Sequence, residues 1–281
     1  MPFPDMFGES RYCITSEHMK AFRSRLLTEI PKADRDRYHP SDLQKVKQCD
    51  EYCWRFIVHN RLDLQRALRM ANTALLWRAD IKVHDITELS LPKVYFQLGF
   101  IYPYNLDRYG NHVLVFSLKD YVRNALVLSE AKRFVVFFVE RLFSQYNTNR
   151  ITLLLDCEGV ESRNIDVRLL KFLCIMFRSY YPRSLGFILL RQAPWMFVAA
   201  WKIVKGLLPI EAIERVRFVT TDELTNYIEK EKLPRRMGGT DSYEYDYKPG
   251  FPMGDRCPRL PPLNTVSCTT TTLNVYGMFT A

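Results

Sequence analysis

The chain has 281 residues, of which 47% are hydrophobic and 25% charged, and its formal net charge at neutral pH is +9. This composition is typical of a globular protein with ample core and excludes a disordered chain, and the length allows one large domain or two small ones. The positive charge favours an anionic partner, either the phosphates of nucleic acid or the headgroups of lipids.

The seven cysteines and the apolar runs indicate where the protein acts. No Cys-x-x-Cys pair and no metal-ligand spacing occurs in the sequence, so we expect free thiols, a reducing compartment, no metal and no cofactor. The N-terminus lacks the apolar core of a signal peptide, and no run is long and apolar enough for a transmembrane segment. We therefore expect a cytoplasmic protein that associates peripherally with membranes, at the endoplasmic reticulum if it is part of a longer, anchored protein.

Residues 1–90 are predicted to form an N-terminal helical lobe. Apolar residues recur at helical spacing over 17–30, over 63–77 and between these two stretches. Ser41 and Gln44 have the spacing of a capping box at the start of a helix that runs to about His59, and Asp63 is a suitable N-cap for the next helix.

Strands and helices alternate from residue 91 onward. The pattern predicts strands at 101–106, 112–118, 151–155, 185–190 and 216–220 and helices at 91–98, 129–146, 165–181, 195–208 and 222–230. We therefore expect an α/β fold in which a mainly parallel or mixed sheet is flanked by helices. The domain covers 91–247, and 248–281 form an irregular C-terminal tail, loose from Gly250 onward.

The predicted helix over 195–208 is apolar around more of its circumference than one core-facing stripe requires. A second apolar face must therefore contact a cavity, a partner or a membrane. The alternative is that this helix simply packs on the sheet.

An ordered set of marks surrounds this helix: Tyr180-Tyr181-Pro182, Pro194-Trp195, Lys202-Ile203-Val204-Lys205, Leu233-Pro234 and Gly238-Gly239. In this order they resemble the CRAL-TRIO family of lipid-binding and lipid-transfer proteins, and the resemblance covers roughly residues 50–247. It implies a helical lobe followed by a domain that encloses an apolar cavity, and a non-catalytic protein that binds a lipid or other hydrophobic ligand and transfers it between membranes.

The resemblance also implies roles for individual residues. The cavity would be lined from one helix and two strands, by Phe134, Phe137, Phe138, Leu142, Ile151, Leu153, Leu155, Phe187 and Leu189. The helix 195–208 would be a gate that opens at an anionic membrane surface, through Trp195, Met196, Phe197, Trp201, Lys202, Val204, Lys205, Leu207 and Leu208. In this gate the aromatic side chains would anchor at the interface and the lysines would meet anionic headgroups.

Two arginines stand at positions that recognise headgroups in the family. Arg183 replaces the Glu that follows the Tyr-Pro step in phosphoinositide-transferring members, and Arg215 replaces their partner Lys. Ile151 and Leu153 replace hydroxyl residues of phosphatidylcholine-binding members, so neither familiar headgroup signature is intact. The arginines are either phosphate ligands at the mouth of the cavity or exposed surface residues, and both alternatives stay open.

Other functions have less support in the sequence. Asp156-Cys157-Glu158-Gly159 is the best candidate for acid–base catalysis, but Asp156 is more simply explained as a residue that ends a strand and bonds to the next turn. No nucleophile elbow, phosphate-binding loop or nucleic-acid module occurs, so we expect neither an enzyme nor a nucleic-acid partner. The alternative function is a protein-interaction scaffold that keeps the fold and fills its pocket.

Overall fold

The computed structural model describes residues 14–29, 36–207 and 210–260, and the chain divides into two compact units. The described residues of the first unit are 14–29, 36–82 and 177–183, and the second unit contains the rest. The division therefore comes after Lys82, before the predicted boundary at residue 90. The Tyr180-Tyr181-Pro182 mark, which we assigned to the α/β domain, belongs to the helical unit.

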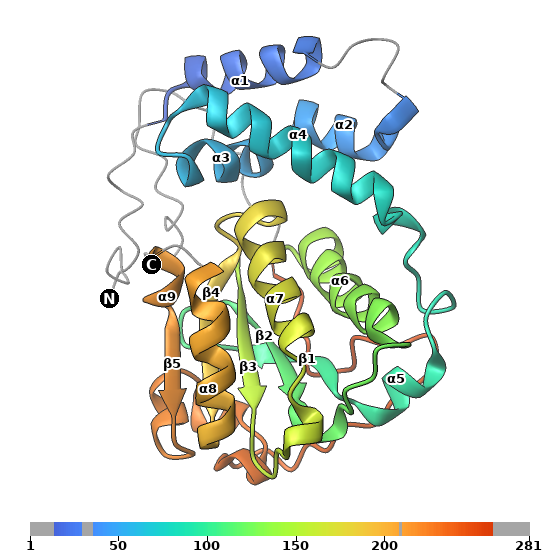
Figure 1. Cartoon of the computed structure of the whole chain (residues 1–281), viewed down its shortest axis with the longest axis vertical. Coiled ribbons are helices and arrows are strands. Elements are labelled where there is room, and N and C mark those ends of the chain that lie inside the picture. The colour runs from blue at the N-terminus through green and yellow to red at the C-terminus, as the bar shows by residue number, and fades with distance from the viewer. Residues whose placement is uncertain (1–13, 30–35, 208–209, 261–281) are drawn as a thin grey trace. The chain divides into compact units, whose positions relative to one another are not determined.

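The helical unit contains α1 (Ser16–Glu29), α2 (Pro40–Gln48), α3 (Asp50–His59) and α4 (Leu64–Asp80) (Figure 1). The single helix predicted up to His59 is wrong, because Cys49 adopts an extended conformation and separates α2 from α3. The prediction that Asp63 is the N-cap of α4 is confirmed, since its carboxylate accepts a hydrogen bond from the Arg66 amide at 3.0 Å. The apolar faces of the four helices meet in one core.

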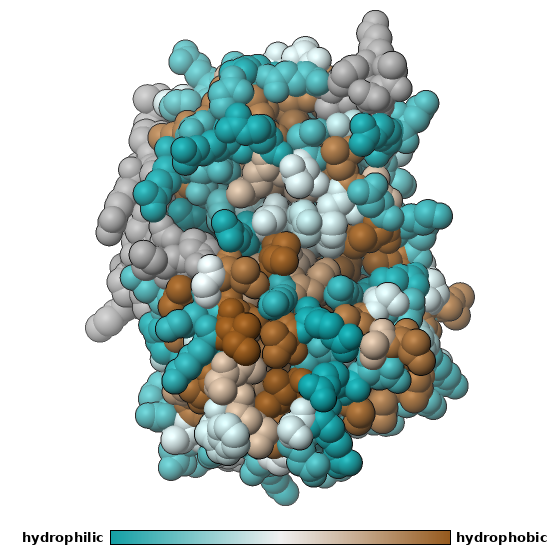
Figure 2. All heavy atoms as spheres, viewed as in Figure 1, coloured by the Kyte–Doolittle hydropathy of each residue, from teal (hydrophilic) through white to brown (hydrophobic). Residues whose placement is uncertain are grey.

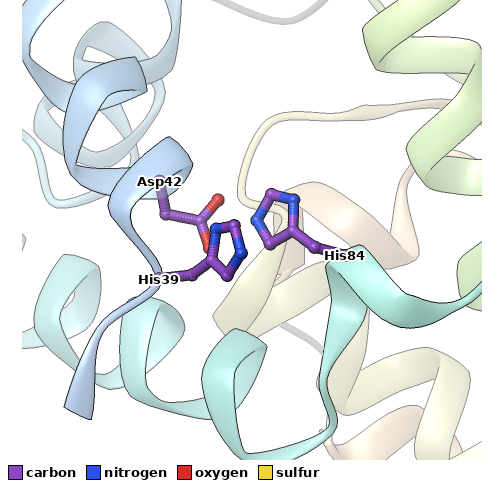
Figure 3. A group of neighbouring side chains, drawn as sticks. All are labelled: His39, Asp42 and His84. Atoms are coloured by element: carbon purple, nitrogen blue, oxygen red, sulfur yellow. The ribbon is translucent and has the colours of Figure 1, made fainter. Parts of the chain in front are cut away.

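The first turn of α2 holds two polar side chains, His39 and Asp42 (Figure 3). The His39 Nδ1 atom accepts a hydrogen bond from the Ser41 amide at 3.2 Å, so His39 caps the helix in place of the predicted Ser41 capping box. Asp42 is buried and pairs with the buried Arg78 of α4 at 2.8 Å. This pair joins α2 to α4 in the interior of the helical unit.

The segment 177–183 packs on α4 and α3 within the same unit. The rings of Tyr180 and Trp77 are stacked, with centroids 4.1 Å apart, and Tyr181 meets Trp77 edge to face. Arg55 Nη1 donates to the Arg183 carbonyl at 3.2 Å. Side chains of α4 and α3 therefore hold the Tyr-Tyr-Pro segment in place.

The second unit is built on one five-stranded sheet with strand order β1-β2-β3-β4-β5. The strands are β1 (Ile101–Leu106), β2 (His112–Ser117), β3 (Ile151–Asp156), β4 (Leu185–Arg191) and β5 (Val216–Val219). The hairpin pair β1–β2 is antiparallel and the other three pairs are parallel. The predicted α/β fold with a mainly parallel sheet is confirmed.

The helices that connect the parallel strands cover one face of this sheet. These helices are α6 (Leu128–Gln145), α7 (Val167–Ile175), α8 (Trp195–Val204) and the short α9 (Ile210–Ile213), and α5 (Lys93–Leu98) precedes β1. Right-handed crossovers between strands in sequential order place their helices on the same side of a sheet, and Figure 1 shows α6, α7 and α8 together in front of it.

The segment after residue 234 covers the other face, which we call the strap face. The ring of Tyr102 on β1 lies 4.7 Å from that of Tyr245, and the ring of Tyr104 lies 5.1 Å from that of Tyr243. Beyond this face the segment reaches the end of α6, where the Leu260 amide donates to the Tyr146 carbonyl at 3.2 Å and His112 Nε2 lies 2.6 Å from the Pro258 carbonyl oxygen. The prediction of a loose tail from Gly250 onward is therefore wrong for residues 250–260. Residues 261–281 lie outside the described part of the chain.

Two helix predictions in this unit are also corrected. The helix predicted over 222–230 is only a 3₁₀ turn at Glu223–Asn226, and the helix predicted to residue 181 ends as a π-helical turn over Met176–Tyr180. None of the helices in the described ranges is both long and apolar enough to cross a bilayer.

Candidate functional site

The α8 helix buries one stripe of side chains and exposes another. Phe197, Ala200 and Val204 recur at helical spacing and are buried. Trp201, Leu207 and Val204 pack against Cys174 of α7 and its apolar neighbours. The inner stripe of α8 therefore joins the core, and Phe197 is not the interfacial anchor that the sequence predicted.

The outer face of α8 carries large apolar residues in contact with solvent. Trp195 is 78% exposed and Ile203 is 61% exposed, and Lys202 and Lys205 are exposed beside them. Figure 2 shows hydrophobic side chains on the molecular surface over α7 and α8. The second apolar face expected from the sequence is present, with Met196 and Leu207 half-buried, and the predicted Leu208 lies outside the described residues.

The residues predicted to line a cavity are all buried, but they lie on two faces of the sheet. Leu153 pairs in register with Ile188, and Leu155 pairs with Leu190, so these four side chains share the face that the helices cover. Leu189 pairs with Leu154 and faces the other way. Phe187, which shares the strand face of Leu189, meets the rings of Tyr109 and Tyr227 at 5.0 and 5.2 Å.

Phe187 and Leu189 therefore cannot line the same space as Leu153 and Leu155. The error comes from treating β4 as one apolar run, because successive side chains of a strand point to opposite faces. Ile188 and Leu190 lie on the helix face instead. The period of two separates the two sets of side chains in the sequence, but it does not show which set faces the helices.

The phenylalanines of α6 belong to a closely packed aromatic cluster. Phe134, Phe137 and Phe138 each meet the ring of Phe96 on α5, at centroid distances of 4.8, 5.4 and 6.3 Å. Phe134 also lies 5.1 Å from Phe100. Edge-to-face contacts of this kind stabilise a core, so part of the predicted lining of the cavity forms packed interior.

The two predicted headgroup arginines have different environments. Arg215 is only 5% exposed, and its Nη1 atom donates a hydrogen bond to the Leu185 carbonyl at the start of β4. Its guanidinium therefore serves the main chain of the sheet and is not an exposed surface residue. Arg183 is half-buried in the helical unit, at a positive φ of 60°, and its carbonyl accepts the bond from Arg55.

Asp156 is the centre of a buried ionic network on the strap face. Its carboxylate lies 3.3 Å from Arg191 on β4 and 2.8 Å from Arg236. Arg236 also donates to the Tyr102 hydroxyl, and burial raises the pKa of this phenol, which keeps it neutral. Each oxygen of the Asp156 carboxylate is thus paired with a guanidinium group, as expected for a structural ionic network.

Main-chain contacts near Asp156 agree with the simpler sequence interpretation. Its Oδ1 atom also accepts from the Glu158 amide at 3.4 Å, as expected for a residue that ends a strand and bonds the next turn. Glu158 pairs with Arg191 at 2.5 Å and is largely exposed. Asp156 and Glu158 are therefore joined through one arginine in a structural network.

The Gly238-Gly239 mark is explained by close packing. Gly238 has a φ of 85°, in the left-handed region, and a side chain at Gly239 would collide with the Leu233 carbonyl oxygen. A pocket of about 330 Å³ follows this turn, lined by Asn105, Glu231, Lys232, Thr240, Asp241 and Arg256. Because its lining is polar and charged, this pocket does not suit an acyl chain.

The α/β unit thus has a mainly parallel sheet, connecting helices on one face of it, and an apolar outer face on α8. The model of the CRAL/TRIO domain matches residues 96–239, and the chain belongs to this family. The structure is also similar to the crystal structure of Sfh5, with a TM-score of 0.62 and 14% sequence identity, over 87% of this chain and 91% of that one.

Two relatives in sequence extend the comparison. The chain is 27% identical over 220 residues to the phosphatidylinositol transfer protein CSR1 of Eremothecium gossypii, covering 73% of this chain and 50% of that protein. It is 23% identical over 204 residues to CRAL-TRIO domain-containing protein C3H8.02 of Schizosaccharomyces pombe, covering 69% and 46%. The chain thus spans about half the length of these relatives. A closer likeness to the CRAL-TRIO domain of motile sperm domain-containing protein 2, which the marks also suggest, stays a prediction.

Ile203 is exposed on α8 but is not among the predicted gate residues. It lies eight positions after Trp195, and a separation of eight places two side chains on the same side of a helix. The spacing from Trp195 therefore places Ile203 on the outer face of α8 from the sequence alone. The flanking Lys202 and Lys205 do not distinguish Ile203 from Val204 in this way.

Proposed function

We propose that this chain binds a lipid or other hydrophobic ligand and transfers it between membranes without forming or breaking a covalent bond. Its membership of the CRAL/TRIO family supports this, as does its similarity to a relative named as a phosphatidylinositol transfer protein. We place the activity at the cytoplasmic surface of a membrane. In this proposal the chain is the lipid-binding module, and if it is part of a longer protein, that protein transfers lipid through it.

The outer face of α8 is the observation that carries the proposal. An exposed tryptophan and an exposed isoleucine cost free energy in water, and both gain it at a bilayer interface. The neighbouring Lys202 and Lys205 would attract anionic headgroups at about 1 kcal/mol each. Trp195, Ile203 and the two lysines therefore suit contact with an anionic membrane.

The ends of α8 support a helix that moves as a gate. Its N-cap is Pro194, whose side chain cannot accept a hydrogen bond from the first turn. An N-terminus without a cap is less stable by about 1 kcal/mol than one with a side-chain cap. At its C-terminal end the α-helix gives way to a 3₁₀ turn at Lys205–Leu207. In this proposal α8 opens when its outer face enters the membrane.

The ligand would lie between the helices and the helix face of the sheet, against Leu153, Leu155, Ile188 and Leu190. Moving a lipid tail from a bilayer into such a space costs little, and exclusion from water retains it with ~0.8 kcal/mol per CH₂. No headgroup is assigned, because Arg215 is bonded to the main chain of β4.

The test has two parts. Native mass spectrometry of protein purified without detergent, with extraction of lipids, should show one hydrophobic ligand for each chain. Transfer of labelled phospholipid between vesicles should then be at least about tenfold slower for Trp195→Ala combined with Ile203→Ala, from the apolar area removed. Ala199→Ser is the matched control, since it changes the same exposed face without removing a large apolar side chain.

An empty protein that also fails to take up labelled lipid would overturn the proposal. It would favour the second candidate, a protein-interaction scaffold with a filled interior. The close packing of Phe134, Phe137 and Phe138 on Phe96 is the observation in favour of this alternative. Equal transfer rates for the α8 double variant and the wild type would overturn the proposed role of α8 but not lipid transfer itself.

A further inference from the structure

A second exposed apolar surface lies in the α/β unit, on α5 and on the loops before α5 and α6. It consists of five large aliphatic residues, which we call the α5 patch: Leu89, Val94, Leu98, Val122 and Leu126. Leu89 is 98% exposed and Leu126 is 88% exposed. Figure 2 shows hydrophobic side chains over the region of α5, apart from those over α7 and α8.

Contacts between the two segments make the patch a local feature of the fold. The Tyr95 hydroxyl donates to the Val127 carbonyl at 3.2 Å, which joins α5 to the end of the loop 121–127. The rings of Phe100 and Tyr121 lie 5.5 Å apart, and join the end of α5 to the start of that loop. Val94 and Leu98 are one helical turn apart on α5 and lie on the same side.

The charges in these segments are arranged for an anionic partner. Within residues 88–98 and 119–127 the exposed charged side chains are Lys93, Lys119 and Arg123. The two acids of the same segments are half-buried and bonded within the fold. Glu88 accepts from the Tyr247 hydroxyl at 2.6 Å, and Asp120 accepts from the Ser117 hydroxyl at 2.5 Å. Within these two segments the exposed charge is therefore positive.

The form of the patch favours a bilayer over a protein. Protein interfaces concentrate their binding energy in aromatic and arginine side chains that fill well-packed pockets. The α5 patch instead presents aliphatic side chains, and the two most exposed, Leu89 and Leu126, come from separate loops. A bilayer accepts such side chains independently of one another, and nearby basic residues add attraction to anionic lipids.

We propose that the α5 patch is a second membrane-docking surface, which inserts Leu89 and Leu126 into an anionic bilayer while α8 exchanges the ligand. This proposal rests on the proposed function, since lipid exchange requires the protein to dock on a bilayer. A second point of contact would keep the protein on the surface during the exchange, when α8 alone would have to serve as both anchor and gate.

The experiment measures sedimentation with vesicles of phosphatidylcholine that contain phosphatidylserine, with pure phosphatidylcholine vesicles as a comparison. The test variant is Leu89→Glu combined with Leu126→Glu, and we expect it to bind at least about tenfold more weakly than the wild type, from lost insertion and added repulsion. The matched control is Gln97→Glu, which adds a negative charge at an exposed position of α5 and removes no apolar side chain. Far-ultraviolet circular dichroism checks that each variant is folded.

Each outcome decides the proposal. Weaker binding by the double variant, with near-normal binding by Gln97→Glu, supports it. Binding of the double variant equal to that of the wild type overturns it, as does failure of the wild type to bind either kind of vesicle. A wild-type dimer that the double variant loses, in the absence of vesicle binding, would assign the patch to self-association and also overturn it.

The ligand content of the same samples separates this proposal from the proposed function. A wild type that carries no ligand but needs Leu89 and Leu126 for vesicle binding would support docking through the α5 patch and overturn lipid transfer. A double variant that carries its ligand and still binds vesicles normally would do the reverse.

Discussion

Removal of the Asp156 carboxylate is the sharpest test of the ionic network on the strap face. Asp156 is 3% exposed and lies between Arg191, which is 1% exposed, and the partly exposed Arg236. Breaking a buried ion pair by removing one partner costs about 3–5 kcal/mol, because the remaining charge stays buried. Arg191 keeps its pair with Glu158, and Arg236 retains access to water, so we expect the lower end of this range for Asp156→Ala.

The predicted loss of about 3 kcal/mol lowers the melting temperature by roughly 6–12 °C for a chain of this size. Urea unfolding followed by circular dichroism measures the change in the free energy of unfolding. The matched control is Glu158→Ala, which removes the exposed partner of the same arginine and should cost at most about 1 kcal/mol. A cost below about 0.5 kcal/mol for Asp156→Ala, or equal costs for both variants, would refute the assignment of Asp156 as the centre of the network.

Three further predictions concern packing and pH. Gly239→Ala should lower the free energy of unfolding by about 2–3 kcal/mol, because the new methyl group collides with the Leu233 carbonyl; an unchanged urea midpoint would contradict this. Burial lowers the pKa of His112 below its ordinary value of 6.5, so the unfolded chain binds a proton first and stability should fall as the pH drops below that value; His112→Asn should reduce this slope, and an unaltered slope would count against it. Val204→Ala should cost about 1–3 kcal/mol and the neighbouring Ile203→Ala less than about 0.5 kcal/mol, and the opposite order would show that the faces of α8 are wrongly assigned.

The order of the elements and the family were accessible from the sequence. Short apolar runs such as Leu185–Leu190 gave the strands, and the helical spacing of apolar residues gave α1, α4, α6 and α8, because both patterns depend only on local periodicity. The ordered marks around Pro194 and Gly238-Gly239 led to the family. Gly239 carries such a signal because the turn leaves no space for a side chain.

The tertiary structure alone decided which face each side chain joins and what it contacts there. Phe187 and Ile188 look alike in an apolar run, but strand pairing places them on opposite faces of the sheet. Arg215 and Lys202 are both basic residues beside apolar segments. Arg215 is buried and donates a hydrogen bond to the Leu185 carbonyl, whereas Lys202 is exposed. Only folding brings Arg215 near the start of β4. The end of the loop that holds Leu126 likewise lies beside α5, although Tyr95 and Val127 are more than thirty residues apart in the sequence. Local periodicity therefore determined most of the elements of this protein, and long-range pairing determined which of their surfaces are left to contact a ligand or a membrane.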